Sequence, residues 1–208
     1  MNARPRTHRR PKRSTVVGAL PGSSVFLVGF MGAGKSSVGR ALGQRLNWVF
    51  EDLDDRIEAR EGRPVAEIFR DSGESEFRRA EHAALKYVLG ELRGGGTRII
   101  ALGGGAFVQE ENAALLEASG VPTVFLDAGV EELWQRCRAQ AAESGVERPL
   151  LRTREQFRKL YQKRRRSYAK ASVTILTGGR AVATIAAEIA EKLKLREIVV
   201  RTEQGEVE

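Results

Sequence analysis

The residues best suited to chemistry form a glycine-rich segment near the start of the chain. This segment reads Gly29-Phe-Met-Gly-Ala-Gly-Lys-Ser36 and matches the pattern G-x-x-x-x-G-K-[ST]. Its glycines allow consecutive backbone N–H groups to converge on phosphate oxygens, and a following helix would add the positive end of its dipole. Lys35 would reach the β- and γ-phosphates, and the Ser36 hydroxyl would bind Mg²⁺. Because the segment lies between an expected strand and an expected helix, the sequence predicts binding of a nucleoside triphosphate.

Two carboxylates, Asp52 and Asp54, follow the second expected strand. In an extended segment alternate residues point the same way, so both side chains can face one cleft. One could hold Mg²⁺ through water, and the other could orient or deprotonate an acceptor hydroxyl. Asp55 comes next, and we expect it to begin or cap the following helix. An acidic cluster is also typical of an ordinary helix start, so the pattern by itself leaves both interpretations open.

A second group of residues is suited to an anionic acceptor. Arg78 and Glu81 are three apart on an expected helix, where the acid can hold a guanidinium whose planar fork suits a carboxylate. The alternative for this pair is a solvated contact on the surface. The run Gly103-Gly104-Gly105 follows an expected strand, at the sheet edge where α/β proteins bind ligands, and would let the backbone approach a ligand closely. A flexible turn is the alternative there.

Two further basic positions bear on the phosphates and the acceptor. Arg148 lies in a polar stretch between two expected helices, where a mobile arginine would stabilise the transferring charge and exclude water on closure. The run Lys163-Arg164-Arg165-Arg166 lies on an expected helix. Most residues of such a run face solvent, but one could turn inward to an anionic substrate.

The elements that must position these residues alternate along the chain between short apolar segments and longer amphipathic ones. We expect strands at 24–28, 48–51, 98–102, 123–126 and 173–176, and helices at 35–46, 65–71, 74–92, 110–118, 130–140, 154–171 and 181–193. Strand and helix in alternation imply parallel strands joined by helical crossovers. The sequence therefore predicts an α/β fold, a three-layer sandwich around a central parallel sheet of about five strands.

Composition excludes several classes of protein. The 208 residues, 41% of them hydrophobic, fit one globular domain with a sizeable core. One cysteine cannot form an internal disulfide, which excludes a disulfide-built secreted domain. No apolar run approaches the roughly 18 residues of a membrane-spanning helix. We therefore expect a cytoplasmic enzyme with no membrane contact.

The net charge of +8 is concentrated at one end of the chain. Residues 1–14 contain six basic side chains and no acidic one: Arg4, Arg6, Arg9, Arg10, Lys12 and Arg13. We expect residues 1–22 to form a disordered basic extension, capable of weak contact with RNA but not of stable nucleic-acid binding. Residues 23–195 would form the domain, and 196–208 a polar C-terminal tail.

Taken together, residues 23–195 resemble the shikimate kinase family. The segments that carry the resemblance are, in order, GFMGAGKSSVGRAL, EDLDD, GRPVAEIFRDSGESEFRRAE, LGGGA, RPLL and KRRRSY. The phosphate loop is shared by many families, whereas the order and spacing of the other segments is far more specific. The resemblance implies a P-loop kinase fold with a mobile lid at about 141–153. It also implies a reaction in which MgATP phosphorylates the 3-hydroxyl of shikimate, a step in chorismate and aromatic amino-acid biosynthesis.

The resemblance also implies roles for individual residues. Asp54 would be the general base that contacts the shikimate hydroxyls, while Asp52 would help Ser36 to organise Mg²⁺. Arg78 and Arg164 would clamp the substrate carboxylate. The remaining substrate contacts would be Glu81, Gly103, Gly104 and Gly105. Lys35 and Arg148 would stabilise the transferring phosphate. The ATP contacts would be Gly32, Ala33, Gly34, Lys35, Ser36, Ser37, Arg148 and Arg180.

Some positions depart from the family pattern. Ser37 stands where the family often has threonine, and Val182 stands where it often has a proline beside the adenine-binding arginine, here Arg180. The second face of adenine would come from Arg136 or Arg138. In the basic run, the register favours Arg164 as the second clamp, with Arg165 as the alternative.

Two other functions fit parts of the sequence. Another small-molecule kinase of the same fold, such as gluconate kinase, shares the phosphate loop and acts on an anion. A regulatory nucleotide-binding protein would instead use its basic tail on RNA and would turn over no small acceptor. We expect ATP and shikimate as the partners of a monomeric enzyme, with Mg²⁺ as the cofactor.

Overall fold

Five parallel strands form the central sheet of the molecule, in the order β2-β3-β1-β4-β5. The computed structural model describes residues 24–144 and 153–198. Its strands are β1 (Ser24–Val28), β2 (Val49–Asp52), β3 (Arg98–Ala101), β4 (Thr123–Asp127) and β5 (Val173–Leu176). The central strand is β1, in which Ser24 pairs with Arg98 of β3 and Phe26 with Thr123 of β4. The parallel sheet that the sequence predicts is confirmed.

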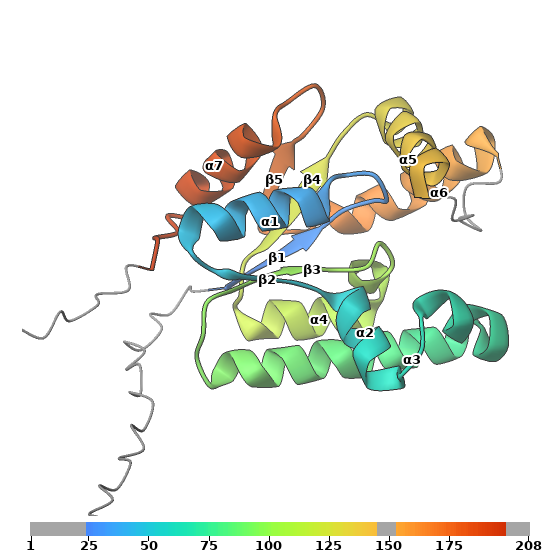
Figure 1. The fold of residues 1–208 in the computed structure, drawn as a ribbon, viewed down its shortest axis with the longest axis horizontal. Helices are drawn as coiled ribbons and strands as arrows, with labels where there is room; N and C mark the ends of the chain where they lie inside the picture. The colour runs from blue at the N-terminus through green and yellow to red at the C-terminus, as the bar shows by residue number, and fades with distance from the viewer. Residues whose placement is uncertain (1–23, 145–152, 199–208) are drawn as a thin grey trace, which may run out of the picture.

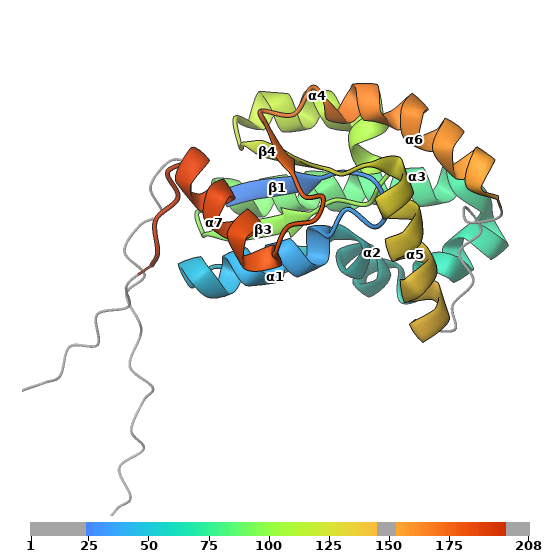
Figure 2. The same ribbon diagram turned by 90° about the horizontal axis from the view of Figure 1, so that it is seen from above.

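Helices cover both faces of this sheet and give three layers (Figures 1 and 2). The helices of the described residues are α1 (Lys35–Leu46), α2 (Leu53–Glu61), α3 (Val65–Arg93), the 3-10 helix η1 (Ala106–Val108), α4 (Glu110–Ser119), α5 (Val130–Ser144), α6 (Arg154–Tyr168) and α7 (Val182–Lys192). One face carries α1 and α7, which pack together, and the other carries α3 and α4, with α6 beside α4. Because both faces are covered, every residue of β1 and β4 is buried.

The long helix α3 is interrupted at Gly73, whose φ of 79° and ψ of 174° are not helical. Only glycine adopts this backbone conformation at little cost, so the chain changes direction there. The two helices predicted on either side of this residue are therefore present as the two arms of α3. The second arm runs along the sheet and brings Arg78 and Glu81 toward its carboxyl edge.

The start of α2 differs from the prediction. Asp52, rather than Asp55, caps the helix: its side chain accepts a hydrogen bond from the backbone N–H of Asp54. Asp55 lies in the first turn, where its charge favours the positive end of the helix dipole. A second difference is η1, a single 3-10 turn that follows Gly105 and that no periodic pattern in the sequence predicts.

Two residues that we assigned to the C-terminal tail are bonded to the domain. The indole N–H of Trp48 donates to the Arg196 carbonyl over 3.1 Å, and the backbone N–H of Ile198 donates to the Leu46 carbonyl over 3.0 Å. Both contacts join this segment to the turn between α1 and β2. The described chain thus stays attached to the domain as far as residue 198.

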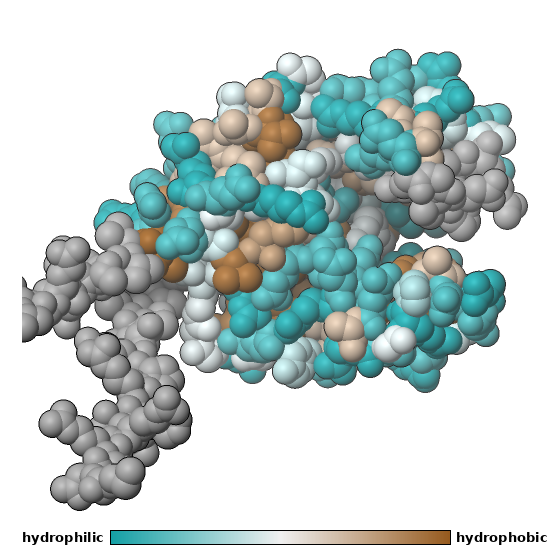
Figure 3. Space-filling view, in the orientation of Figure 1, coloured by the Kyte–Doolittle hydropathy of each residue, from teal (hydrophilic) through white to brown (hydrophobic). Residues whose placement is uncertain are grey.

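Hydrophilic side chains cover most of the described surface on the face drawn in Figure 3, and apolar ones are scattered in small patches. None of the helices in residues 24–144 and 153–198 combines the length and the apolar character that crossing a bilayer requires. The buried apolar residues instead gather in one core, between the sheet and the helices on its two faces.

Candidate active site

The phosphate loop connects β1 to α1 and packs tightly against its neighbours. Gly29, Gly32 and Gly34 have φ values of 148°, 78° and 89°, which other residues rarely adopt. A methyl group added at Gly29 would lie 2.8 Å from the Leu126 carbonyl oxygen, and one at Gly32 would lie 2.8 Å from the Cys137 sulfur. The loop therefore requires glycine both for its conformation and for its close approach to β4 and α5.

Two side chains of this loop are held at the N-terminus of α1. The Lys35 amine donates to the carbonyl oxygens of Gly29 and Phe30, over 3.0 and 3.2 Å, and so curls over the loop. The Ser36 hydroxyl donates to Asp52 Oδ2 over 3.0 Å. The loop is thereby joined to the end of β2, where the predicted acids lie.

The donor set formed by Ser36 and Asp52 fits a magnesium ion. Both groups offer oxygen, the ligand that this hard cation prefers. Magnesium bound with a nucleotide takes only one or two protein ligands and fills its other positions with phosphate oxygens and water. The described residues contain no cluster of three or more acidic, histidine or cysteine side chains that could enclose a metal.

Asp54 lies in the first turn of α2 and points into the site. Its Oδ1 atom is buried and has no hydrogen-bond partner among the described residues. Burial is the main reason why the pKa of Asp54 rises to about 6, and the nearby charge of Asp52 raises it further, whereas Lys35 opposes the rise. A half-buried carboxylate with a raised pKa and a free acceptor oxygen is suited to take a proton from a substrate hydroxyl.

Glu81 is fully buried beside Asp54, on the second arm of α3. Its Oε2 atom accepts hydrogen bonds from Arg78 over 2.9 Å and from Gln109 over 2.6 Å. Burial raises the pKa of Glu81, and the positive charge of Arg78 opposes that rise. Arg78 also bonds Glu74, one turn earlier, over 2.9 Å. Two acids therefore hold its guanidinium in one orientation.

The three glycines that follow β3 each touch a different part of the predicted site. A methyl group at Gly103 would lie 2.9 Å from Asp54 Oδ1 and 3.0 Å from Glu81 Oε1. One at Gly105 would collide with the guanidinium of Arg78. The run is therefore no ordinary flexible turn, because its lack of side chains lets the acids and the arginine approach the backbone.

Arg164 reaches the same run from α6. Its Nη1 donates to the Gly104 carbonyl over 3.2 Å, and its guanidinium carbon lies 5.9 Å from the centre of the Phe30 ring. The Tyr168 hydroxyl donates to the same carbonyl. Arg165 instead pairs with Asp127 at the end of β4, over 2.6 Å, and 53% of its side chain is exposed. Of the two arginines considered at the sequence level, Arg164 is therefore the one that faces the site.

The residues predicted near adenine lie around the loop between β5 and α7. Arg136 bonds the carbonyls of Gly32 and Thr177, over 3.4 and 3.1 Å, and so connects the phosphate loop to this loop. Arg180 donates to the Leu176 carbonyl over 2.7 Å and pairs with Glu188 of α7 over 2.6 Å.

The remaining predicted residues are less connected or outside the structure. Arg138 lines a separate pocket of about 500 Å³ with Trp134 and Arg154. Ser37 is exposed in the first turn of α1, and Ala33 is buried in the loop. Arg148, with most of the expected lid, lies outside the described residues.

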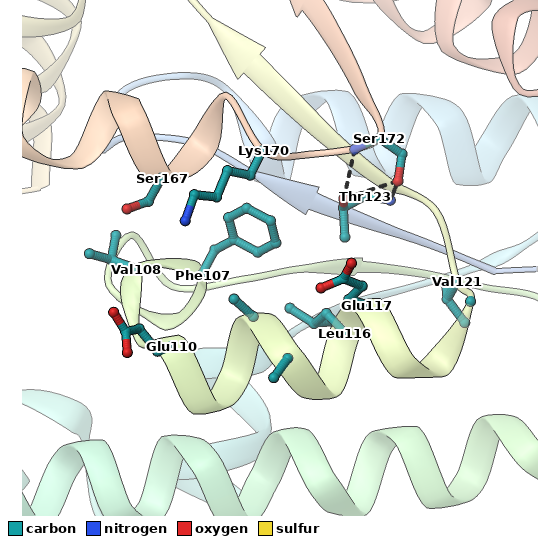
Figure 4. Close-up of a pocket in the computed structure, with 13 residues that line it drawn as sticks. Phe107, Val108, Glu110, Leu116, Glu117, Val121, Thr123, Ser167, Lys170 and Ser172 are labelled. Atoms are coloured by element: carbon teal, nitrogen blue, oxygen red, sulfur yellow. Dashed lines mark hydrogen bonds between the residues drawn. The ribbon is translucent and has the colours of Figure 1, made fainter.

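A pocket of about 590 Å³ lies elsewhere, between α4 and the end of α6 (Figure 4). Phe107 and Leu116 contribute buried apolar side chains to it, and Lys170 extends toward it from the turn that follows α6. None of the residues that line it is a predicted site residue. The candidate active site is instead the carboxyl edge of the sheet, where the loop, the acids and the arginines meet, as expected for an α/β fold.

Two residues of this site, Gln109 and Tyr168, have no role that the sequence predicts. Gln109 contacts Glu81 from a position 28 residues later in the chain, and nothing in its spacing announces that contact. Tyr168 closes the segment KRRRSY, but only its buried place on α6 shows that its hydroxyl reaches Gly104. Burial is the main cause that raises its pKa to about 12, so Tyr168 acts here as a neutral donor.

Comparison with known proteins agrees with this geometry. Residues 31–194 match a family model described as "Shikimate kinase". A curated "Shikimate kinase" of Persephonella marina is 35% identical over 172 residues, which are 82% of this chain and 99% of the relative. Another, from Symbiobacterium thermophilum, is 41% identical over 177 residues, or 83% of this chain and 97% of the relative.

Solved structures give the same result. "Shikimate kinase from Acinetobacter baumannii in complex with shikimate" aligns with a TM-score of 0.73 at 32% identity, covering 83% of this chain and 93% of that one. The shikimate kinase of Aquifex aeolicus aligns with a TM-score of 0.70 at 32% identity, covering 82% and 96%.

Proposed function

The chain belongs to the shikimate kinase family, and we propose that it transfers the γ-phosphoryl group of ATP to the 3-hydroxyl of shikimate, giving 3-phosphoshikimate and ADP. The chain is thus an ATP-dependent kinase. Its reaction is a step in chorismate and aromatic amino-acid biosynthesis.

One observation carries this proposal: a single run of glycines is in contact with both the acid and the basic side chains. Gly103 lies against Asp54, while Gly104 and Gly105 lie against Arg164 and Arg78. Shikimate is a small carboxylate with several hydroxyls, so it needs a positive clamp for its ring and a nearby acid to select one hydroxyl. The two arginines supply the clamp, and Asp54 selects the hydroxyl that reacts.

In the reaction, Asp54 accepts the proton of the attacking hydroxyl on its free Oδ1 atom. The substrate hydroxyl replaces the partner that this buried oxygen lacks. Phosphoryl transfer otherwise requires alignment and charge neutralisation more than covalent help from the protein. Lys35 supplies part of that neutralisation at the phosphate loop, and Arg148 adds to it from the other side of the transferring group.

The remaining residues of the site divide between the nucleotide and the metal. Ser36 and Asp52 would hold Mg²⁺, which neutralises charge on the β- and γ-phosphates when it is bound. The backbone of residues 32–37 binds the phosphates. Arg180 is the proposed adenine contact, and of the two candidates for the second face of adenine, Arg136 is favoured by its bond to the Thr177 carbonyl.

Three further expectations complete the proposal. The domain comprises the predicted residues 23–195 together with residues 196–198, which are bonded to it, and its lid at about 141–153 closes over the nucleotide. The enzyme acts as a monomer in the cytoplasm. The basic residues 1–14 contribute no stable binding of nucleic acid.

Steady-state ADP release with MgATP tests the function directly, with shikimate, gluconate, AMP or no acceptor present. Turnover that depends on shikimate is the expected result. Turnover with gluconate alone would assign the chain to a different small-molecule kinase. If ATP binds and no acceptor is phosphorylated, the regulatory alternative gains support, and binding of RNA that deletion of residues 1–14 abolishes would support it further.

A further inference from the structure

Glu81 has two hydrogen-bond donors on one oxygen and none on the other. Its side chain is 0% exposed, and Oε2 accepts from Arg78 Nη1 and from Gln109 Nε2. Its Oε1 atom is buried and has no partner among the described residues. Because a buried carboxylate depends on its donors for orientation, the two bonds to Oε2 determine which way the whole group faces.

Among the described residues, the one hydrogen bond of the Gln109 side chain is the bond that helps to orient Glu81. It lies between η1 and α4, and its neighbours Val108 and Glu110 line the pocket between α4 and α6 (Figure 4). The Gln109 side chain instead bonds Glu81. It does not cap α4, although the residue occupies the cap position. Its backbone carbonyl accepts from Ala113 over 3.0 Å, a bond that any side chain at position 109 would leave intact.

We propose that Gln109 is a positioning residue for substrate binding, which acts through Glu81 to hold the Arg78 guanidinium ready for the substrate carboxylate. This inference rests on the proposed function, because it assumes that Arg78 receives that carboxylate. Gln109 touches neither the acceptor nor the phosphate in this scheme. Gln109 affects the reaction through Oε2 of Glu81, the oxygen to which both Gln109 and Arg78 donate.

Glu81 lies among charges of both signs. It faces Asp54 of α2, Arg78 of its own helix and the Tyr168 hydroxyl of α6, besides Gln109. Burial and the charge of Asp54 favour the protonated form of Glu81, whereas Arg78 and the Gln109 amide favour the carboxylate. Removing the amide raises the pKa of Glu81 further and weakens its ion pair with Arg78, so that Glu74 becomes the main acid that orients the guanidinium.

Two variants of Gln109 test the idea with shikimate as the varied substrate. Gln109→Glu keeps the shape of the side chain but replaces its donor with a second negative oxygen, and Gln109→Leu removes the polar group. We expect KM for shikimate to rise about tenfold in the first and about threefold in the second, with kcat and KM for ATP within about twofold of the wild type. As pH falls, the rise in KM for shikimate should begin at a higher pH than in the wild type.

The control is Glu110→Gln. Glu110 is the next residue in the chain and the first of α4, but it lines the pocket of about 590 Å³ between α4 and the end of α6. This variant should leave KM for shikimate unchanged. A purely structural role of Gln109 predicts a lower melting temperature and an unmoved pH dependence of KM. If both Gln109 variants keep the wild-type KM and pH dependence, the inference is wrong. If the wild type itself does not phosphorylate shikimate, the proposed function fails first, and the inference falls with it.

Discussion

The hydroxyl of Ser36 donates a 3.0 Å hydrogen bond to Asp52 Oδ2, which joins the first turn of α1 to the end of β2. The other oxygen of the same carboxylate accepts from the backbone N–H of Asp54 over 3.2 Å. One aspartate is therefore shared between the proposed metal site and the turn that carries the proposed base. A substitution of Asp52 should therefore affect both Mg²⁺ binding and the proposed base.

We predict that Asp52→Asn weakens the response to Mg²⁺. Asparagine still caps α2 but lacks the negative charge that attracts the cation. The Mg²⁺ concentration for half-maximal ADP release should rise roughly tenfold at fixed ATP. Because the Asp52 charge raises the pKa of Asp54, the acid limb of the activity profile should also move to lower pH. The matched control is Asp55→Asn, an exposed neighbour. Equal Mg²⁺ dependence in both variants would contradict the metal assignment.

The second prediction concerns Asp54 as the base. Asp54→Asn keeps the size of the side chain but cannot accept the proton, so turnover should fall roughly 100-fold or more. ATP affinity should persist, because the phosphate loop is unchanged, and equilibrium titration with ATP measures it. Near-normal turnover in this variant would exclude Asp54 as the base.

The third prediction follows from the cost of ionising Asp54 in the folded protein. Its pKa lies at about 6 when folded and near the ordinary 3.8 when unfolded, so the folded state binds the proton more tightly. The stability that Asp54 contributes is present at low pH, and it is lost as the pH rises through this window. The difference corresponds to at most about 3 kcal/mol in the free energy of unfolding.

Asp54→Asn should therefore melt at a higher temperature than the wild type at pH 8, and the gap should close toward pH 4. Thermal unfolding across this range measures it. Asp71→Asn, at an exposed aspartate that pairs with Arg70, is the control for loss of a charge and should produce no such gain. If Asp54→Asn is less stable than the wild type at pH 8, the charge of Asp54 does not lower the free energy of unfolding, and the prediction is wrong.

The sequence predicts the fold and the chemical class of the site well, for physical reasons. Strands buried in a sheet that is covered on both faces are apolar along their whole length, whereas apolar residues in helices recur every 3.6 residues. The alternation of strands and helices can therefore be recognised from the sequence. Asp52 and Asp54 do meet at one edge, but Asp54 lies in the first turn of α2 and not in the extended segment that the spacing argument assumed. The glycine at position 73 correctly indicates the break in α3.

Contacts between distant segments are less predictable. The bond from Gln109 to Glu81 joins the turn between η1 and α4 to α3, and no periodicity encodes which polar side chain after η1 points inward. The residue that caps α2 is also hard to predict, because Asp52, Asp54 and Asp55 all have side chains that can cap a helix. Asp52 rather than Asp55 caps α2 because β2 ends there, which is a property of the sheet and not of the acidic run.

The final prediction separates two adjacent arginines that the sequence leaves as alternatives. Neighbours on a helix point about 100° apart, so only one of them can face the glycine run. Arg164 bonds the Gly104 carbonyl, whereas Arg165 pairs with Asp127. Loss of a charged hydrogen-bonding partner of the substrate carboxylate should raise KM for shikimate roughly tenfold to a hundredfold in Arg164→Ala. Arg165→Ala removes an equal charge one position away and should leave that KM within about twofold. Steady-state kinetics with both substrates distinguishes the outcomes. If Arg164→Ala raises only KM for ATP, Arg164 binds the nucleotide. If Arg165→Ala raises KM for shikimate more than Arg164→Ala does, the roles of the two arginines are reversed.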